Sequence, residues 1–232
     1  MSNNHGDIVI EAPASYKWVE GTLTKITYVA EAGDVKYESL QKAIDAAKSK
    51  AVVTMLADTR ENVTISTPYN GLMLHASAAA LGGRAYLFSG PCGRGKSTHT
   101  RLWQQTFGEA VQVFNDDKPA LRRLAGRWYA YGTPWCGKDG INLNQKWPLG
   151  GICFLEKSQE NRIRRLSAAE ALPLILAQTT YRLPPQYMEL LLASLDSLLR
   201  EIPVFLLENR PEEAAARLSF ETMRRAAEEG GL

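Results

Sequence analysis

Apolar residues along this chain follow two spacings, which together predict a mixed α/β fold. Short apolar runs bounded by turn residues are typical of strands, whereas apolar residues three and four positions apart are typical of a helix with one buried face. The predicted strands are 8–10, 16–19, 26–29, 51–56, 63–66, 72–77, 78–81, 86–88, 111–114, 121–124, 128–131, 152–155 and 204–207. The predicted helices are 39–50, 98–107 and 168–178, the last with a capping box at its start. A further helix is predicted from Pro184, followed by a charged helical tail from Pro211; the core face of the helix from Pro184 is Met188, Leu191, Leu192, Leu195, Leu198 and Leu199.

The two parts of the chain differ in the motifs they carry. Residues 1–70 are rich in predicted strands and hold no recognisable chemical motif, so we expect a small β-rich lobe packed on the core. Residues 71–232 hold the candidate site and end in predicted helices. A chain of 232 residues is long enough for one good-sized α/β domain with a small appendage.

Composition and charge limit the classes of partner. A chain that is 45% hydrophobic and 22% charged is typical of a globular protein, and a net charge of +2 gives no argument for nucleic acid or a membrane as partner. The sequence begins with a polar segment, and no apolar run approaches membrane-spanning length. The three cysteines lack C-x-x-C and metal-ligand spacing, which fits reduced thiols and predicts a cytoplasmic location. The oligomeric state is not predicted.

Residues 90–98 read G-P-C-G-R-G-K-S-T between a predicted strand and a predicted helix. Gly90, Gly93 and Gly95 permit backbone shapes in which successive N–H groups point at a bound polyphosphate, and the following helix presents its positive end to the same anion. Lys96 is expected to face solvent and reach the β- and γ-phosphates, while the Ser97 hydroxyl binds Mg²⁺. The alternative is an ordinary glycine-rich turn with an exposed lysine. The pattern favours ATP and Mg²⁺ as cofactors.

A predicted apolar strand downstream of this loop leads into Asp116 and Asp117. Such a strand can deliver carboxylates to the phosphate end of the site, where one holds the metal and the other accepts a proton from an attacking hydroxyl. The pattern does not say which aspartate has which role. Alternatively, the pair only opens the turn before Lys118 and Pro119.

Two further side chains are candidates for the same site. His75 lies near the end of a strand that should neighbour the strand before the glycine-rich loop, although a single histidine is more often structural. Lys138, in a loop punctuated by glycine and proline, could stabilise charge on a transferred phosphoryl group or could simply be solvated.

The order of His75, the glycine-rich loop and F-N-D-D at 114–117 resembles the catalytic domain of HPr kinase/phosphorylase. The match is closer to the smaller related serine kinases, including those that act on lasso-peptide precursors. The segments Y-G-T-P-W-C-G-K at 131–138 and I-P-V-F-L-L-E at 202–208 also resemble these smaller kinases. The wider relative is the ATP-binding domain of phosphoenolpyruvate carboxykinase. The resemblance implies a P-loop core of this type, with His75 and the aspartates around the reacting hydroxyl. If His75 lies beside the aspartates, the carboxylates and the bound phosphates should favour its protonated form.

These observations predict an ATP-dependent kinase that phosphorylates a hydroxyl, preferably a serine of a peptide or protein. The alternatives are a kinase for a small metabolite hydroxyl, such as a free amino acid, sugar or nucleoside, and a nucleotide-binding regulator without catalysis. The predicted nucleotide-binding residues are Gly90, Pro91, Cys92, Gly93, Arg94, Gly95, Lys96, Ser97 and Thr98; the predicted catalytic residues are His75, Asp116, Asp117 and Lys138; the predicted metal ligands are Ser97, Asp116 and Asp117.

Overall fold

The computed structural model describes residues 16–19, 22–47, 53–56, 71–179 and 188–232. The chain divides into two compact units, Met1–Thr67 and Pro68–Leu232, each of which is considered by itself. The strands predicted at 8–10 and 63–66, and the predicted helix start at Pro184, lie outside the described residues. The packing of the lobe on the core stays a prediction.

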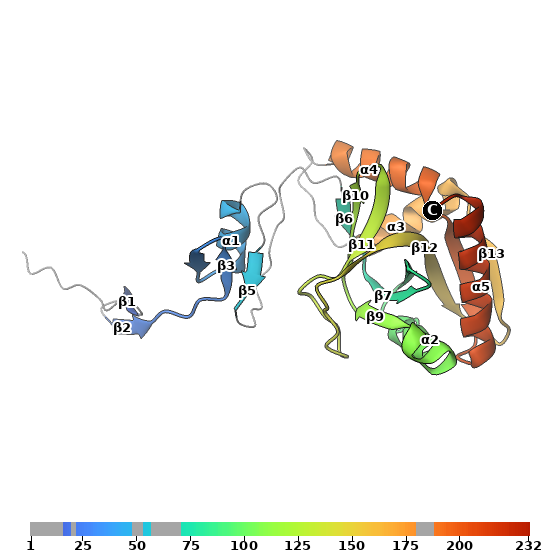
Figure 1. Cartoon of the computed structure of the whole chain (residues 1–232), viewed down its shortest axis with the longest axis horizontal. Coiled ribbons are helices and arrows are strands. Elements are labelled where there is room, and N and C mark those ends of the chain that lie inside the picture. Colours follow the sequence, from blue (N-terminus) through green and yellow to red (C-terminus); the bar gives the residue numbers. More distant parts are fainter. Residues whose placement is uncertain (1–15, 20–21, 48–52, 57–70, 180–187) are drawn as a thin grey trace, which may run out of the picture. The chain divides into compact units, whose positions relative to one another are not determined.

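Short strands and one helix make up the described part of the N-terminal unit (Figure 1). The elements are β1 (Tyr16–Val19) paired with β2 (Thr22–Lys25), β3 (Ala30–Ala32) between β4 (Val35–Tyr37) and β5 (Val53–Met55), and α1 (Leu40–Ala46). Ser39 caps α1, since its hydroxyl accepts a hydrogen bond from the Lys42 amide. The strand predicted at 26–29 is wrong. This segment connects β2 to β3 and is not itself a strand.

One nine-stranded sheet organises the described part of the second unit. Its strands lie in the order β6 (Gly71–Met73), β10 (Ala120–Leu124), β11 (Arg127–Tyr131), β12 (Lys146–Lys157), β8 (Arg84–Ser89), β7 (Ala76–Leu81) and β9 (Gln112–Asn115), while β14 (Val204–Asn209) pairs with β12 and β13 (Arg162–Arg165) pairs with β14. The helices are α2 (Lys96–Phe107), a 3₁₀ turn (Gly108–Ala110), α3 (Ala168–Gln178), α4 (Met188–Glu201) and α5 (Glu213–Glu229). The mixed α/β fold predicted from the sequence is therefore observed.

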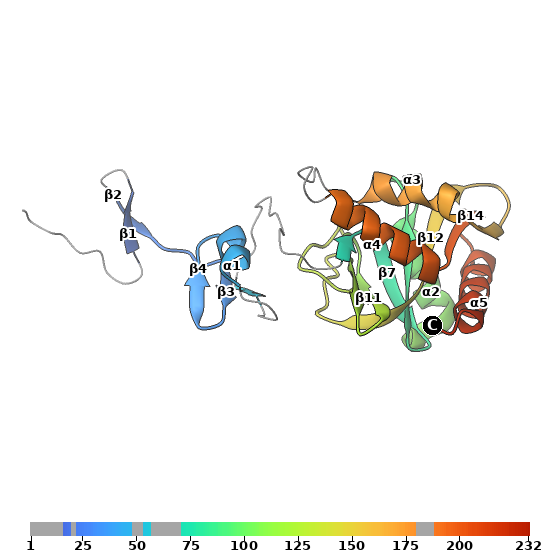
Figure 2. The ribbon, with the colours of Figure 1, turned by 90° about the horizontal axis from the view of Figure 1, so that it is seen from above.

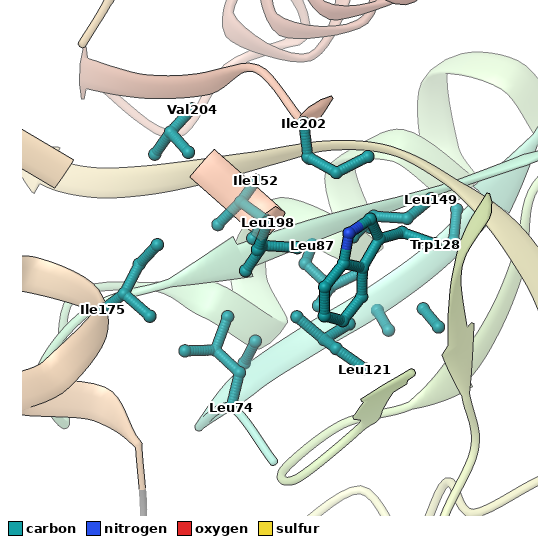
Figure 3. Close-up of a cluster of buried hydrophobic side chains, with 14 of the residues drawn as sticks. Leu74, Leu87, Leu121, Trp128, Leu149, Ile152, Ile175, Leu198, Ile202 and Val204 are labelled. Atoms are coloured by element: carbon teal, nitrogen blue, oxygen red, sulfur yellow. The ribbon is translucent and has the colours of Figure 1, made fainter. Parts of the chain in front are cut away.

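The helices cover the sheet from both faces (Figures 1 and 2). Side chains of α3 and α4, including Ile175 and Leu198, pack with Leu87, Ile152 and Trp128 in the core cluster of Figure 3. On the other face, α2 and α5 pack through a second buried cluster. None of the helices in the described ranges is both long and apolar enough to cross a membrane.

The apolar face predicted for α4 is only partly buried. Leu195 and Leu198 are fully buried, but Met188 and Leu192 are 40% and 46% exposed. The predicted core face is therefore wrong at Met188 and Leu192, while Leu191 and Leu199 are partly buried against the core. At the start of α3, by contrast, the predicted capping box is confirmed, because Ser167 and Glu170 bond each other's backbone amides.

Strand β12 joins the two parts of the sheet and is much longer than the segment predicted at 152–155. Its first residues pair antiparallel with β11, and the remainder pairs parallel with β8 and β14. The register shifts between Leu149 and Gly151, where a Cβ on Gly150 would lie 2.9 Å from the Tyr86 ring. The glycine allows the strand to bend against Tyr86, and apolar periodicity alone does not reveal this continuation.

The strand directions place the carboxyl ends of β8 and β9 at one edge of the sheet. Both strands pair antiparallel with β7, which lies between them. Ala76, the first residue of β7, is opposite Ser89, the last residue of β8. Residues directly before β7, directly after β8 and directly after β9 therefore lie at the same edge.

A buried polar cluster ties α2 to α5. The Ser219 hydroxyl donates to the Ala216 carbonyl and accepts from Trp103 Nε1–H, and it lies 2.9 Å from His99 Nε2. When the single hydroxyl proton is directed to Ala216, His99 donates from Nε2. Burial lowers the pKa of His99 to about 3, so its ring is neutral.

Replacing Ser219 by alanine should lower the free energy of unfolding by about 2–4 kcal/mol, since two buried N–H groups would lose their acceptor. Chemical denaturation of the full chain measures the change. The control is Ser197→Ala on α4, where the hydroxyl contacts Glu201 and the expected change is within about 0.5 kcal/mol. Equal losses in the two variants would contradict the proposed importance of this cluster.

Candidate active site

The glycine-rich loop, Gly90–Ser97, follows β8 directly and leads into α2. Gly90, Gly93 and Gly95 have φ angles of +137°, +80° and +98°, which residues other than glycine rarely adopt. Gly95 is the N-cap of α2, so the loop ends where the first free amide groups of the helix begin. A loop of this backbone geometry that leads into a helix N-terminus is of the kind that binds anions.

Lys96 does not face solvent as expected from the sequence. Its side chain is buried, and Nζ donates to the carbonyl oxygens of Gly90 at 2.8 Å and Pro91 at 3.2 Å. Burial lowers the pKa of Lys96, while Cys92 and Asp117 act in the opposite direction. The loop therefore holds the ammonium group in place through its own carbonyls.

His75 lies between β6 and β7, and its backbone is held from two sides. Its carbonyl accepts a hydrogen bond from the Ser89 hydroxyl at 2.9 Å, and its amide donates to the Gln178 carbonyl at 2.9 Å. Nδ1 lies 3.0 Å from Gln178 Oε1, and Nε2 lies 3.7 Å from Asp117 Oδ1. The imidazole thus lies between the end of α3 and the end of β9.

The pKa of His75 is lowered from its ordinary value, although the neighbouring Asp117 acts to raise it. Burial is the largest cause and the positive charge of Lys96 the next, and together they outweigh the hydrogen bond to Gln178 and the charge of Asp117. In the absence of phosphate the imidazole is therefore disposed to be neutral at neutral pH. The same effects show that Lys96, His75 and Asp117 share one electrostatic neighbourhood.

The two adjacent aspartates have different surroundings. Asp116 is 5% exposed, and its Oδ1 and Oδ2 accept from the amides of Gly137 at 2.7 Å and Asp139 at 3.0 Å. Asp117 instead faces His75, and its other oxygen contacts Lys118 Nζ. Asp116 anchors a loop, whereas Asp117 presents its carboxylate beside the imidazole.

Asn115, which the sequence analysis did not select, fixes the backbone around both aspartates. Its Nδ2 donates to the carbonyls of Thr133 and Trp135, while its Oδ1 accepts from the amides of Asp117 and Lys118. The position before an aspartate pair and a turn is a favourable one for such side-chain bonding. Gln178 was also missed, and no local motif marks it.

Lys138 lies on the loop that Asp116 anchors and is exposed. No hydrogen bond or ion pair of its side chain is found within the described ranges. The neighbouring Asp139 pairs with Arg101 of α2, which fastens this loop to the helix that follows the glycine-rich loop. The structure thus places Lys138 on a loop tied to α2, and its role stays a prediction.

A cavity of about 290 Å³ opens beside the imidazole. It is lined by His75, Asp117, Lys118, Ala177, Gln178 and Thr179. The carboxyl end of α3 forms one wall, and a bridge between Leu74 and Thr179 holds that end against the segment before His75. A small polar group entering this cavity would meet both His75 and Asp117.

The residues present fit a magnesium–nucleotide complex by their chemistry. The Ser97 hydroxyl and the Asp116 carboxylate, whose oxygens keep a second lone pair each, are the hard oxygen donors that Mg²⁺ prefers. Within the described residues, no three His, Cys, Asp or Glu side chains form a cluster that could hold a metal ion alone. A magnesium site that phosphate oxygens complete needs fewer protein ligands.

No protein-family model and no curated protein matches the sequence. Among solved structures, the Hpr(Ser) kinase/phosphatase from Coxiella burnetii is similar, with 14% sequence identity and a TM-score of 0.39. The alignment covers 68% of this chain and 90% of that chain. This is a distant structural likeness, and it places the chain in no family.

Proposed function

We propose that this chain is an ATP-dependent kinase that transfers the γ-phosphoryl group to a hydroxyl, preferably that of a serine in a peptide or protein. The observation that carries the proposal is the meeting of three features at one sheet edge. These are the glycine-rich loop after β8, His75 before β7 and Asp117 after β9. Phosphoryl transfer needs this combination of an anion site and a base beside an acceptor site.

Each residue has a defined part in the proposed reaction. The loop amides and Lys96 hold the triphosphate and stabilise the charge that develops on the transferred group. Ser97 and Asp116 would hold Mg²⁺, which when bound lowers the negative charge of the phosphates. Loop 132–140, anchored by Asp116, carries Lys138 as a further candidate for charge stabilisation.

The proposed acceptor site is the cavity beside His75. The acceptor hydroxyl loses its proton to Asp117 as its oxygen forms a bond to the γ-phosphorus, and the bond to the β–γ bridging oxygen breaks to release ADP. Asp117 is a better candidate for the base than Asp116, because Asp117 lines this cavity and lies beside His75, whereas the Asp116 carboxylate is turned to the amides of Gly137 and Asp139. A cavity of about 290 Å³ can hold a serine side chain with its flanking backbone atoms.

Incubation with radiolabelled ATP, Mg²⁺ and a library of serine-containing peptides should transfer label from the γ-position to peptide. Free serine, sugars and nucleosides in parallel reactions test for a metabolite acceptor, and a reaction without acceptor measures hydrolysis. Label on a metabolite alone would replace the proposed acceptor class. Nucleotide binding without transfer to any hydroxyl would reject the kinase and favour a regulatory nucleotide-binding protein.

A further inference from the structure

Gln178, at the carboxyl end of α3, contacts His75 through both its backbone and its side chain. The Gln178 carbonyl accepts from the His75 amide at 2.9 Å, and Oε1 lies 3.0 Å from Nδ1. Gln178 also lines the cavity beside the imidazole. Two contacts to one residue hold both the position and the rotation of the ring.

The side-chain contact determines which ring nitrogen of a neutral His75 carries the proton. An amide oxygen only accepts hydrogen bonds, so Gln178 Oε1 requires the proton on Nδ1. The competing acceptor, Asp117 Oδ1, lies 3.7 Å from Nε2, which is too long for a hydrogen bond. The charge of Asp117 is moreover shared with Lys118.

We propose that Gln178 is a positioning residue that fixes His75 as the Nδ1–H tautomer and keeps the Nε2 lone pair open toward Asp117. The consequence for catalysis rests on the proposed kinase function. Once the carboxyl and Nε2 close from 3.7 Å to hydrogen-bond distance, a proton that Asp117 takes from the acceptor hydroxyl can pass to Nε2. This step regenerates the carboxylate and leaves an imidazolium bonded to Gln178. The opposite tautomer already carries a proton on Nε2 and cannot receive another there.

The tautomer can be measured without any activity assay. The chain has three histidines, so selective ¹⁵N-histidine labelling gives few imidazole signals. Nitrogen shifts at pH 8 should identify His75 as the Nδ1–H form. His99, whose Nε2 lies 2.9 Å from the Ser219 hydroxyl, gives a second buried imidazole for comparison and should show the Nε2–H form. An Nε2–H form of His75 in the wild-type chain would overturn the inference.

Two substitutions separate positioning from simple cavity filling. Gln178→Leu keeps similar size but removes the acceptor, and it should shift His75 toward the Nε2–H form and lower kcat by about tenfold or more, with KM for ATP unchanged. Gln178→Glu keeps an acceptor opposite Nδ1 and should retain the Nδ1–H form and recover much of kcat. Gln105→Leu, an exposed change on α2, is the matched control.

The combined readouts distinguish this inference from the kinase proposal. If Gln178→Leu leaves both the tautomer and kcat unchanged, the positioning role is rejected while the kinase stands. If the wild-type chain transfers no phosphate although His75 is the Nδ1–H form, the kinase proposal and the relay are rejected and the structural role of Gln178 is supported. Loss of kcat in Gln178→Leu with an unchanged tautomer also counts against the inference.

Discussion

Replacing Lys96 by alanine should lower the rate of phosphoryl transfer by at least about a hundredfold, the scale of losing one preorganised charge-stabilising group. Lys96 lies buried within the glycine-rich loop, where Nζ is held by the carbonyls of Gly90 and Pro91. A lysine held in this way is ready to meet the phosphates without first losing side-chain freedom. Affinity for ATP with Mg²⁺ should fall as well.

Because Lys96 is buried, its replacement by alanine needs a control for damage to the fold. Because its ammonium bonds two loop carbonyls, alanine removes structural contacts as well as the proposed phosphate ligand. Circular dichroism and thermal unfolding should show the fold retained, since neither carbonyl belongs to the strand ladder. The matched control is Lys157→Ala, an exposed lysine at the end of β12, which should keep full turnover. Unchanged ATP affinity and turnover in Lys96→Ala would contradict the assignment of the loop.

Local signals in the sequence were sufficient for much of the fold. The alternation of apolar runs and helical spacing predicted the mixed α/β class, and Ser167 with Glu170 marked the start of α3. The glycines of the loop at 90–95 have the positive φ angles that their pattern indicated. In these cases the determinant lies within a few residues of the chain.

Features that depend on tertiary contacts were not predictable in this way. The extent of β12 depends on its pairing with three other strands and on the approach of Gly150 to Tyr86. The burial of Lys96 depends on the loop carbonyls, and the lowered pKa of His75 depends on surroundings contributed by several elements. Gln178 lies 103 positions from His75 in sequence, and only the fold brings the two together.

The sequence left the roles of the two aspartates open, and their different contacts lead us to propose different roles. Asp117→Asn should lower kcat by about a hundredfold to ten-thousandfold, because an amide cannot accept the acceptor's proton. The free energy of unfolding and the affinity for Mg²⁺–ATP should change little, since Asp117 is partly exposed and its partners His75 and Lys118 lie beside an open cavity.

Asp116→Asn should instead weaken the fold and the binding of Mg²⁺–ATP. Its two oxygens accept the amides of Gly137 and Asp139, and an asparagine would turn an NH₂ group toward one of these donors. The expected loss is about 1–3 kcal/mol of unfolding free energy for a buried group left without a partner. Release of loop 137–139 and loss of a proposed metal ligand should together raise KM for ATP.

Three measurements on the two isosteric variants decide between these roles. They are chemical denaturation, equilibrium binding of Mg²⁺–ATP and steady-state kinetics. Asp196→Asn on the exposed side of α4 is the control for a change of one charge, and it should behave as the wild-type chain does. If Asp117→Asn retains normal turnover on the true acceptor, Asp117 is not the base. If Asp116→Asn is at least as stable as the wild-type chain but has a lower kcat than Asp117→Asn, the two roles are reversed. Asp116 would then be the base, and its bonds to the loop amides would not be needed for stability.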